Sequence, residues 1–105
     1  ICISMLIYNV TTKVTWAIHQ ECLQWMQQVH IPEVMATGCF NRFQMVRLLE
    51  TEDEDGPTYA VQYHADSHQQ YDTYIEVHAP ALRQSSMEKW GNQFISFRSL
   101  MEIVA

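Results

Sequence analysis

The spacing of hydrophobic residues along the chain predicts the order β-α-β-β-α-β. A strand-like period of two residues alternates with a helical period of about 3.6 residues. In order, the runs cover Met5–Val14, Trp16–His30, Phe40–Glu50, Thr58–Ala65, His68–Trp90 and Phe94–Val104. This order predicts an α+β, ferredoxin-like βαββαβ fold, in which two helices lie on one face of a four-stranded antiparallel sheet.

Local signals predict where the helices begin and end. Thr15 is a suitable N-cap for the first helix, and Ser67 with Gln70 three residues later forms a capping box for the second. Pro32 disfavours helical geometry in the residue before it, so the first helix is expected to end near His30. Pro80 is expected to kink or restart the second helix.

The strands carry apolar residues on both faces, although two helices can cover only one face of the sheet. In the first strand, for example, Tyr8 and Val10 share one face and Ile7 lies on the other. A monomer would therefore expose a large apolar surface, which predicts a homodimer with two sheets packed together as a dimeric α/β barrel. Arg98 and Leu100 are expected on the face turned away from the helices.

Length and composition set further bounds on the protein. The 105 residues, 48% of them hydrophobic, predict one domain over residues 5–105, with residues 1–4 as an N-terminal extension before a plausible start at Met5. A net charge of −6 with six basic residues argues against nucleic-acid binding. No run is long enough to cross a membrane, no signal peptide is recognisable, and three cysteines without a Cys-x-x-Cys pair favour a cytoplasmic protein. The acidic run 50–55 is interpreted as a solvated hairpin tip, with a cation or basic-partner site as the alternative.

Several short segments together resemble an uncharacterised family of short bacterial proteins related to the dimeric α/β-barrel superfamily. These segments are Ile7-Tyr-Asn-Val-Thr, Trp25 with His30-Ile-Pro-Glu and Thr37-Gly, Tyr59-Ala-Val-Gln-Tyr, Ala79-Pro-Ala-Leu-Arg and Phe97-Arg-Ser-Leu. The resemblance extends over nearly the whole chain from Met5, and it implies no catalytic residues, because the family has no established activity. The wider superfamily includes cofactor-free monooxygenases, isomerases, haem-handling enzymes and ligand-sensing modules. Its members often bind small apolar or aromatic ligands between the sheet and the helices, so such a ligand is what the resemblance implies here.

His30 is the candidate catalytic residue. At the expected end of the first helix, the helix dipole and Glu33 would both favour its protonated form, and it would act as a general acid or base. The alternative is a structural histidine that caps the last carbonyl groups of the helix.

Polar residues within the strands have two interpretations each. Asn9 and Gln62 either bond to each other and to Arg98, or line a polar patch in a pocket. Arg47 and Arg98 either pair with Glu50 or Glu102 across the dimer, or one of them binds a ligand carboxylate.

The expected function is the binding of a small, partly apolar ligand between the sheet and the helices, with no cofactor and no metal. The alternative is a small cofactor-free monooxygenase or isomerase that uses His30 as its acid or base. Asn9 and His78 match places used by haem-degrading relatives, but the accompanying tryptophan has no counterpart, and His64 and His68 lack a third metal ligand nearby. The tyrosines and Trp25 are also interpretable as ordinary residues of the hydrophobic core that bind no ligand. The predicted ligand-binding residues are Tyr8, Asn9, Trp25, His30, Tyr63, His64, Tyr71 and His78.

Overall fold

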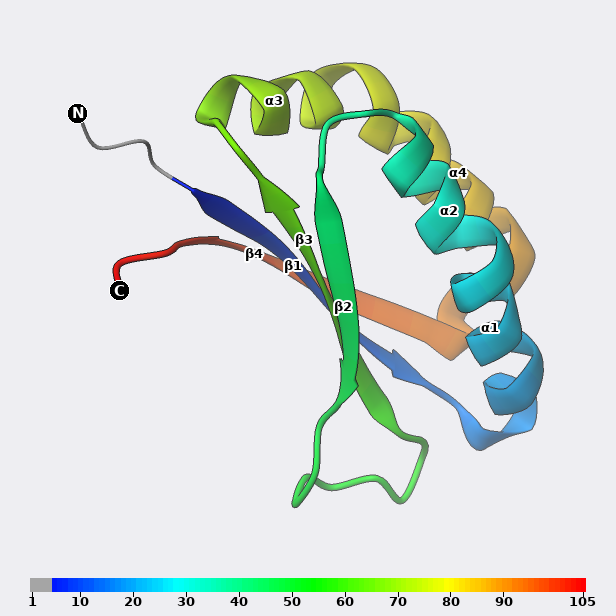
Figure 1. The fold of residues 1–105 in the computed structure, drawn as a ribbon. Helices are drawn as coiled ribbons and strands as arrows, with labels where there is room; N and C mark the ends of the chain where they lie inside the picture. Colours follow the sequence, from blue (N-terminus) through cyan, green and yellow to red (C-terminus); the bar gives the residue numbers. More distant parts are fainter. Residues whose placement is uncertain (1–4) are drawn as a thin grey trace.

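A computed structural model describes residues 5–105, and residues 1–4, the expected N-terminal extension, lie outside that range. It contains one antiparallel sheet with the strand order β2-β3-β1-β4. All helices lie on one face of this sheet (Figure 1). The helical segment between β1 and β2 is called here the first helical layer, and the one between β3 and β4 the second. The ferredoxin-like βαββαβ fold predicted from the hydrophobic pattern is thereby confirmed. The strands are β1 (Leu6–Val14), β2 (Arg42–Arg47), β3 (Thr58–Ala65) and β4 (Phe94–Glu102).

The first helical layer does not end near His30, as Pro32 had suggested. It runs through η1 (Trp16–Ile18), α1 (His19–Trp25), η2 (Met26–His30) and α2 (Ile31–Ala36). The segment η2 is a turn of π-helix, in which the Ile31 N–H donates to the Met26 carbonyl five residues back. A proline has no N–H to contribute, and this wider turn lets the helix continue through Pro32. His30 therefore lies in the middle of a continuous helix and does not cap its end.

The second helical layer repeats this arrangement. It consists of α3 (His68–Thr73), the π-turn η3 (Tyr74–His78), α4 (Ala79–Trp90) and the short η4 (Gly91–Gln93). The Ala79 N–H donates to the Tyr74 carbonyl, and Pro80 follows at once. Both π-turns end in the same pattern, Val-His-x-Pro, at residues 29–32 and 77–80. The Pro80 irregularity predicted from the sequence is thus a π-turn.

The predicted helix caps are observed in part. The Gln70 N–H donates to Ser67 Oγ at 3.2 Å, and the Gln70 side chain accepts from the Asp66 N–H at 3.1 Å. The hydroxyl group of Thr15 makes no cap and instead donates to Gln93 Oε1 at 3.1 Å. The second helix therefore begins as its sequence predicts, whereas Thr15 ties the start of the first helix to η4.

Strand register determines which side chains lie beneath the helices. Tyr8, Val10 and Thr12 of β1 stand opposite Leu100, Arg98 and Ser96 of β4. The hydroxyl groups of Thr12 and Ser96 are 2.9 Å apart. Ser96, Arg98 and Leu100 of β4 therefore lie on the same face of the sheet as the buried Tyr8. The expectation that Arg98 and Leu100 point away from the helices is therefore wrong. The alternate residues of β4, which point to the other face, are the more apolar set, and they lie on the face that no helix covers.

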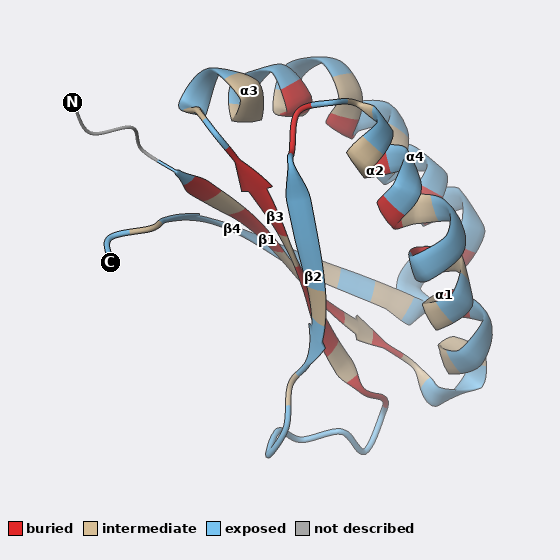
Figure 2. Ribbon diagram, viewed as in Figure 1, coloured by how far each residue is buried: buried red, intermediate tan, exposed pale blue. Residues whose placement is uncertain are grey.

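The face without helices, here called the outer face, combines apolar and polar side chains. Its apolar members Val46, Ile95, Phe97 and Met101 are exposed, whereas the buried residues are concentrated on β1, β3 and the helix sides that face the sheet (Figure 2). A polar row crosses the centre of the outer face in register from β2 to β4. It consists of Gln44, Gln62, Asn9 and Ser99.

The acidic connection between β2 and β3 folds back against the end of β1. The Val14 N–H donates to the Pro57 carbonyl at 3.1 Å, and the Trp16 N–H donates to the Asp55 carbonyl at 3.1 Å. This close approach requires glycine at position 56, because a Cβ atom there would lie 1.7 Å from the Val14 carbonyl oxygen. Across residues 5–105, no helix has the length and apolar character needed to cross a membrane.

Candidate functional site

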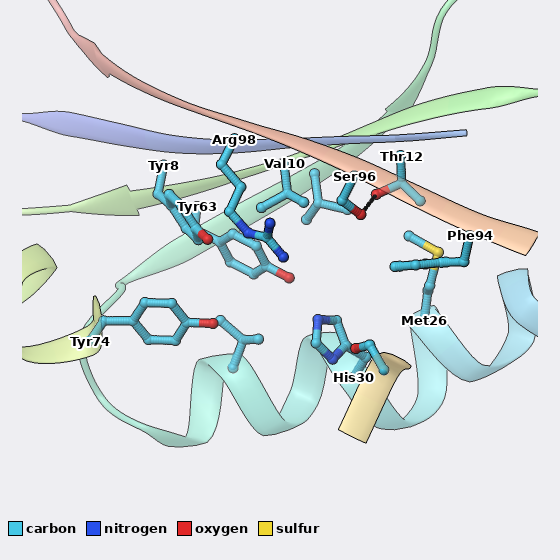
Figure 3. Close-up of a pocket in the computed structure, with 13 residues that line it drawn as sticks. Tyr8, Val10, Thr12, Met26, His30, Tyr63, Tyr74, Phe94, Ser96 and Arg98 are labelled. Atoms are coloured by element: carbon cyan, nitrogen blue, oxygen red, sulfur yellow. Dashed lines mark hydrogen bonds between the residues drawn. The ribbon is translucent and has the colours of Figure 1, made fainter. Parts of the chain in front are cut away.

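The candidate site is a small cavity between the centre of the sheet and the two helical layers. It has a volume of about 30 Å³. Polar side chains point into it from three directions: Tyr8 and Tyr63 from the central strands, Arg98 from β4, and His30 and Tyr74 from the π-turns of the two helices (Figure 3). Its remaining walls are largely apolar and include Val10 and Met26.

His30 is neutral at physiological pH in this position. Burial, and to a lesser degree the positive charge of Arg98, lower the pKa of its imidazole from 6.5 to about 4. Its ring stacks on Trp25, with the ring centroids 4.9 Å apart and an angle of 20° between the planes. The sequence-based expectation of a raised pKa at a helix end is wrong, because the helix continues past His30 and folding buries its ring.

Three tyrosines, Tyr8, Tyr63 and Tyr74, line the cavity together with His30. Tyr8 is central, since its ring lies within 6.2 Å of the Tyr63 ring and 5.5 Å of the Tyr74 ring. Burial raises the pKa of Tyr63 and of Tyr74, so both hydroxyl groups stay protonated and available as hydrogen-bond donors. The Tyr8 hydroxyl accepts a hydrogen bond from Arg83 Nη2 at 3.2 Å.

A wider groove adjoins the cavity between α4 and β4. It has a volume of about 470 Å³ and is open to solvent. The cavity and the groove share four lining residues, which are Ser86, Phe94, Ser96 and Arg98. The groove also has the apolar side chains of Met87 and Ile95 on its walls, together with Arg83. The two spaces thus adjoin each other, the cavity on the polar inner side and the groove, with more apolar than polar surface, on the solvent side.

The eight ligand-binding residues predicted from the sequence fall into three groups. Tyr8, His30 and Tyr63 line the cavity. Trp25, Tyr71 and His78 lie one layer behind it, where they stack on or pack against His30, Tyr8 and Tyr74 respectively. Asn9 and His64 lie on the outer face and do not belong to this cavity.

The polar groups on the outer face have local partners. Asn9 donates to Thr11 Oγ1 at 2.9 Å, and Gln44 donates to Gln62 Oε1 at 2.6 Å. Asn9 and Gln62 stand opposite each other in the β1–β3 register, but Arg98 lies on the other face and cannot join them. Burial and then Arg42 lower the pKa of His64, whose Nδ1 atom has no hydrogen-bond partner within the described residues.

The residues considered as metal or haem ligands from the sequence do not come together in the structure. Among residues 5–105 no three His, Cys, Asp or Glu side chains come together as ligands. His68 contacts Asp72 at 3.5 Å on the surface of α3, away from His64 on the outer face of β3. Asn9 and His78, which matched haem-degrading relatives by sequence, lie on opposite sides of the sheet and do not form one site.

Sequence reasoning missed several of the residues that line the cavity and groove. Tyr74 was not among the residues predicted to bind a ligand, and Arg98 was expected on the other face of β4. The signal that could have found Tyr74 is the repeated Val-His-x-Pro pattern, because Tyr74 belongs to the π-turn that ends in its second copy and π-turns are frequent at functional sites. Arg83 and Ser86 had no such signal, because only packing of α4 against β4 brings them to the groove.

Arg47 makes an ion pair within the chain that was not expected from the sequence. It pairs with Asp53 of the neighbouring loop at 3.6 Å, and its pairing with Glu50 or Glu102 across a dimer stays a prediction. The same loop is tied to β1 by an ion pair between Lys13 and Glu52 at 3.1 Å. The acidic connection thus forms ion pairs with basic residues of its own chain.

Fold and cavity together define an α+β protein of the ferredoxin-like class with a polar cavity between sheet and helices. Residues 5–104 match the family described as Domain of unknown function (DUF4286), and the chain belongs to this family. A comparison with curated protein sequences finds no match.

Solved structures of the same fold include proteins of very different sequence. A protein of the ethyl tert-butyl ether (EthD) family from Bacillus halodurans C-125 has a TM-score of 0.69 and 11% identity, and the match covers 94% of this chain and 99% of that one. A dimeric ferredoxin-like protein from an uncultured marine organism has a TM-score of 0.63 and 12% identity, with 97% of each chain covered. The cofactor-independent oxygenase SnoaB from Streptomyces nogalater has a TM-score of 0.64 and 11% identity, with 99% of this chain and 96% of SnoaB covered.

Proposed function

We propose that this protein is a homodimer that binds a small, partly apolar ligand between its sheet and its helices. The observation that carries the proposal is that the polar cavity adjoins the groove between α4 and β4 and shares four lining residues with it. A water molecule needs roughly 10–15 Å³ of such space, so the cavity of about 30 Å³ accepts only a small group. The groove of about 470 Å³ falls within the range of small-molecule sites, so it would hold the body of the ligand.

The homodimer part of the proposal rests on the outer face of the sheet. Its exposed apolar residues Val46, Ile95, Phe97 and Met101 surround a row of amide and hydroxyl groups that can pair with a second copy. The marine ferredoxin-like protein with the same fold is described as dimeric. A cytoplasmic location is proposed as well, because Cys22 and Cys39 are buried, unpaired thiols of the kind that persist in a reducing compartment.

Ligand binding in the groove is testable with the neutral fluorescent dye Nile red. Met87 is exposed on α4 and lines the groove, so Met87→Trp would fill the groove without disturbing the core. Gln84→Trp is the matched control, because Gln84 is exposed on the same helix but outside the groove. We expect Met87→Trp to weaken Nile red binding at least about tenfold and Gln84→Trp to leave it unchanged. Binding that is indifferent to Met87→Trp would contradict the proposed location.

A cofactor-free monooxygenase or isomerase is the second candidate function. The unprotonated ring of His30 supports it, because an imidazole with a pKa of about 4 has a free acceptor nitrogen at neutral pH, although this pKa makes it a weaker base than a histidine that titrates near neutral pH. Arg98 beside it would stabilise the anion left on the substrate. For any compound that binds and is converted, we expect His30→Asn to lower turnover about 10²–10⁴-fold while binding persists. Unchanged turnover in His30→Asn would exclude His30 as the base.

A further inference from the structure

We propose that the ligand of this site is a small organic carboxylate on an apolar body, with its carboxylate group bound between Arg83 and Arg98. The proposal rests on the function proposed above, that the groove binds a ligand, and adds the chemical class of that ligand. Arg83 belongs to α4 and Arg98 to β4, so the two residues line the groove from its helix wall and from its strand wall. Arg98 also lines the inner cavity, which places it where the two spaces join.

Neither arginine has an acidic partner in the part of the chain that the structure describes. Among residues 5–105, no carboxylate oxygen lies within 4.0 Å of Arg83 or Arg98, whereas Lys13 and Arg47 both have such a partner. The hydrogen bond that Arg83 makes is to a neutral group, the Tyr8 hydroxyl, at 3.2 Å. The groove therefore contains two positive charges that the protein leaves uncompensated.

The cavity and the groove lack acidic residues although the chain as a whole is acidic. The protein has 12 acidic and six basic residues, yet no Asp or Glu lines the cavity or the groove. Two of the six basic side chains thus face one space from which every acidic side chain is absent. Planar guanidinium groups bind carboxylates through two parallel hydrogen bonds, which favours an organic anion over a neutral or cationic ligand.

The surroundings of the arginine pair indicate the rest of the ligand. Met87 is exposed at the groove and Phe94 lies deeper, so an apolar or aromatic body would cover them. Beyond Arg98, the cavity presents neutral hydrogen-bonding groups, the hydroxyls of Tyr63 and Tyr74. A second charge on the ligand would have no partner there, so a monocarboxylate fits better than a dianion.

The test compares 2-naphthoate with 2-naphthalenemethanol, which has the same ring system without the charge. Affinities are measured by isothermal titration calorimetry, and the site is located by amide chemical-shift changes. We expect wild-type protein to bind the carboxylate about tenfold or more tightly than the alcohol, as for a hydrogen bond between charged groups. Arg83→Gln and Arg98→Gln should each weaken carboxylate binding about tenfold and leave alcohol binding unchanged. Arg42→Gln is the matched control, since Arg42 is an exposed arginine on the outer face without an ion pair.

Two outcomes would overturn the proposal in different ways. If acid and alcohol bind in the groove with equal affinity and the arginine variants change neither, the anion preference is wrong while ligand binding in the groove stands. If neither naphthalene compound nor octanoate and octanol bind at about 1 mM, the carboxylate proposal fails. The Nile red titration then decides separately whether the groove binds any ligand.

Discussion

Burial keeps His30 uncharged, and this state makes the folded protein sensitive to acid. The pKa of His30 is about 4 in the folded chain and 6.5 without the fold, so the unfolded chain binds more protons between these values. The contribution of His30 to the free energy of unfolding is therefore fully present above about pH 6.5 and is lost as the pH drops toward 4. The difference corresponds to about 3 kcal/mol of unfolding free energy.

We expect His30→Phe to remove most of this pH dependence, because phenylalanine keeps the stack on Trp25 and cannot be protonated. The measurement is urea denaturation at pH 7.5 and pH 4.5. The lowered pKa of His64 adds a loss of the same sign, which the variant keeps. His68→Gln, at an exposed position, serves as the control and should behave as wild type. An equal acid sensitivity in His30→Phe and wild type would show that His30 is not buried as described.

Gly56 and Gly38 oppose a side chain for two different reasons, steric overlap at Gly56 and backbone strain at Gly38. A Cβ atom at Gly56 would overlap the Val14 carbonyl oxygen, whereas at Gly38 nothing lies within 4 Å and only the positive φ of 76° opposes a side chain. We expect Gly38→Ala to cost about 1–2 kcal/mol, and Gly56→Ala to cost more than about 3 kcal/mol because the β2–β3 loop must leave β1. Urea denaturation of both variants checks the order. Equal losses would mean that the loop shifts easily.

The two helical layers depend on local signals at their starts and on tertiary packing along their length. Ser67 caps α3 through its contact with the Gln70 N–H. We expect Ser67→Ala to destabilise the fold by about 1 kcal/mol, measured by thermal or urea denaturation. Ser85→Ala is the control, since Ser85 is exposed within α4, and it should be close to neutral. No loss in Ser67→Ala would mean that solvent replaces the cap.

The prolines in the helices had been taken as breaks, and only the structure reveals how each helix continues. Pro32 and Pro80 remove a backbone donor, as their chemistry requires. The preceding π-turns carry the helix past each proline and point His30 into the cavity. The rule that a proline ends a helix does not anticipate this, because it considers only the regular α-helical hydrogen bonds and not the wider π-turn.

The outer face of the sheet makes the proposed dimer testable for the molecule as a whole. Phe97 is 68% exposed on this face, and an aspartate there would be buried without a partner in a sheet-to-sheet dimer. We expect Phe97→Asp to convert a dimer of twice the 12.3 kDa chain mass into a monomer, measured by light scattering at micromolar concentration. Val77→Asp, at a helix position that is 65% exposed, should stay dimeric. A monomeric wild-type protein would contradict the dimer itself.

The sequence by itself determined the order of the elements and most of their boundaries. Periodicity depends on local geometry, since residues two apart share a strand face and residues three or four apart share a helix face. Thr58–Ala65 was therefore predicted with its observed limits, and β1, the second helical layer and its Ser67 cap were predicted closely. Tyr8, His30 and Tyr63 could be named because polar tips on apolar elements are visible without a structure.

The tertiary structure alone decided which face of each strand lies under the helices and which side chains meet. Both faces of β4 are apolar enough to be a core face, so its composition favoured the wrong one, and only pairing with β1 places Arg98 beneath the helices. The same pairing sends Asn9 and His64 to the outer face. The charge state of His30 could likewise not be predicted from the sequence. A pKa depends on the burial and the neighbouring charges that folding brings about, here the burial of the ring and the nearby Arg98.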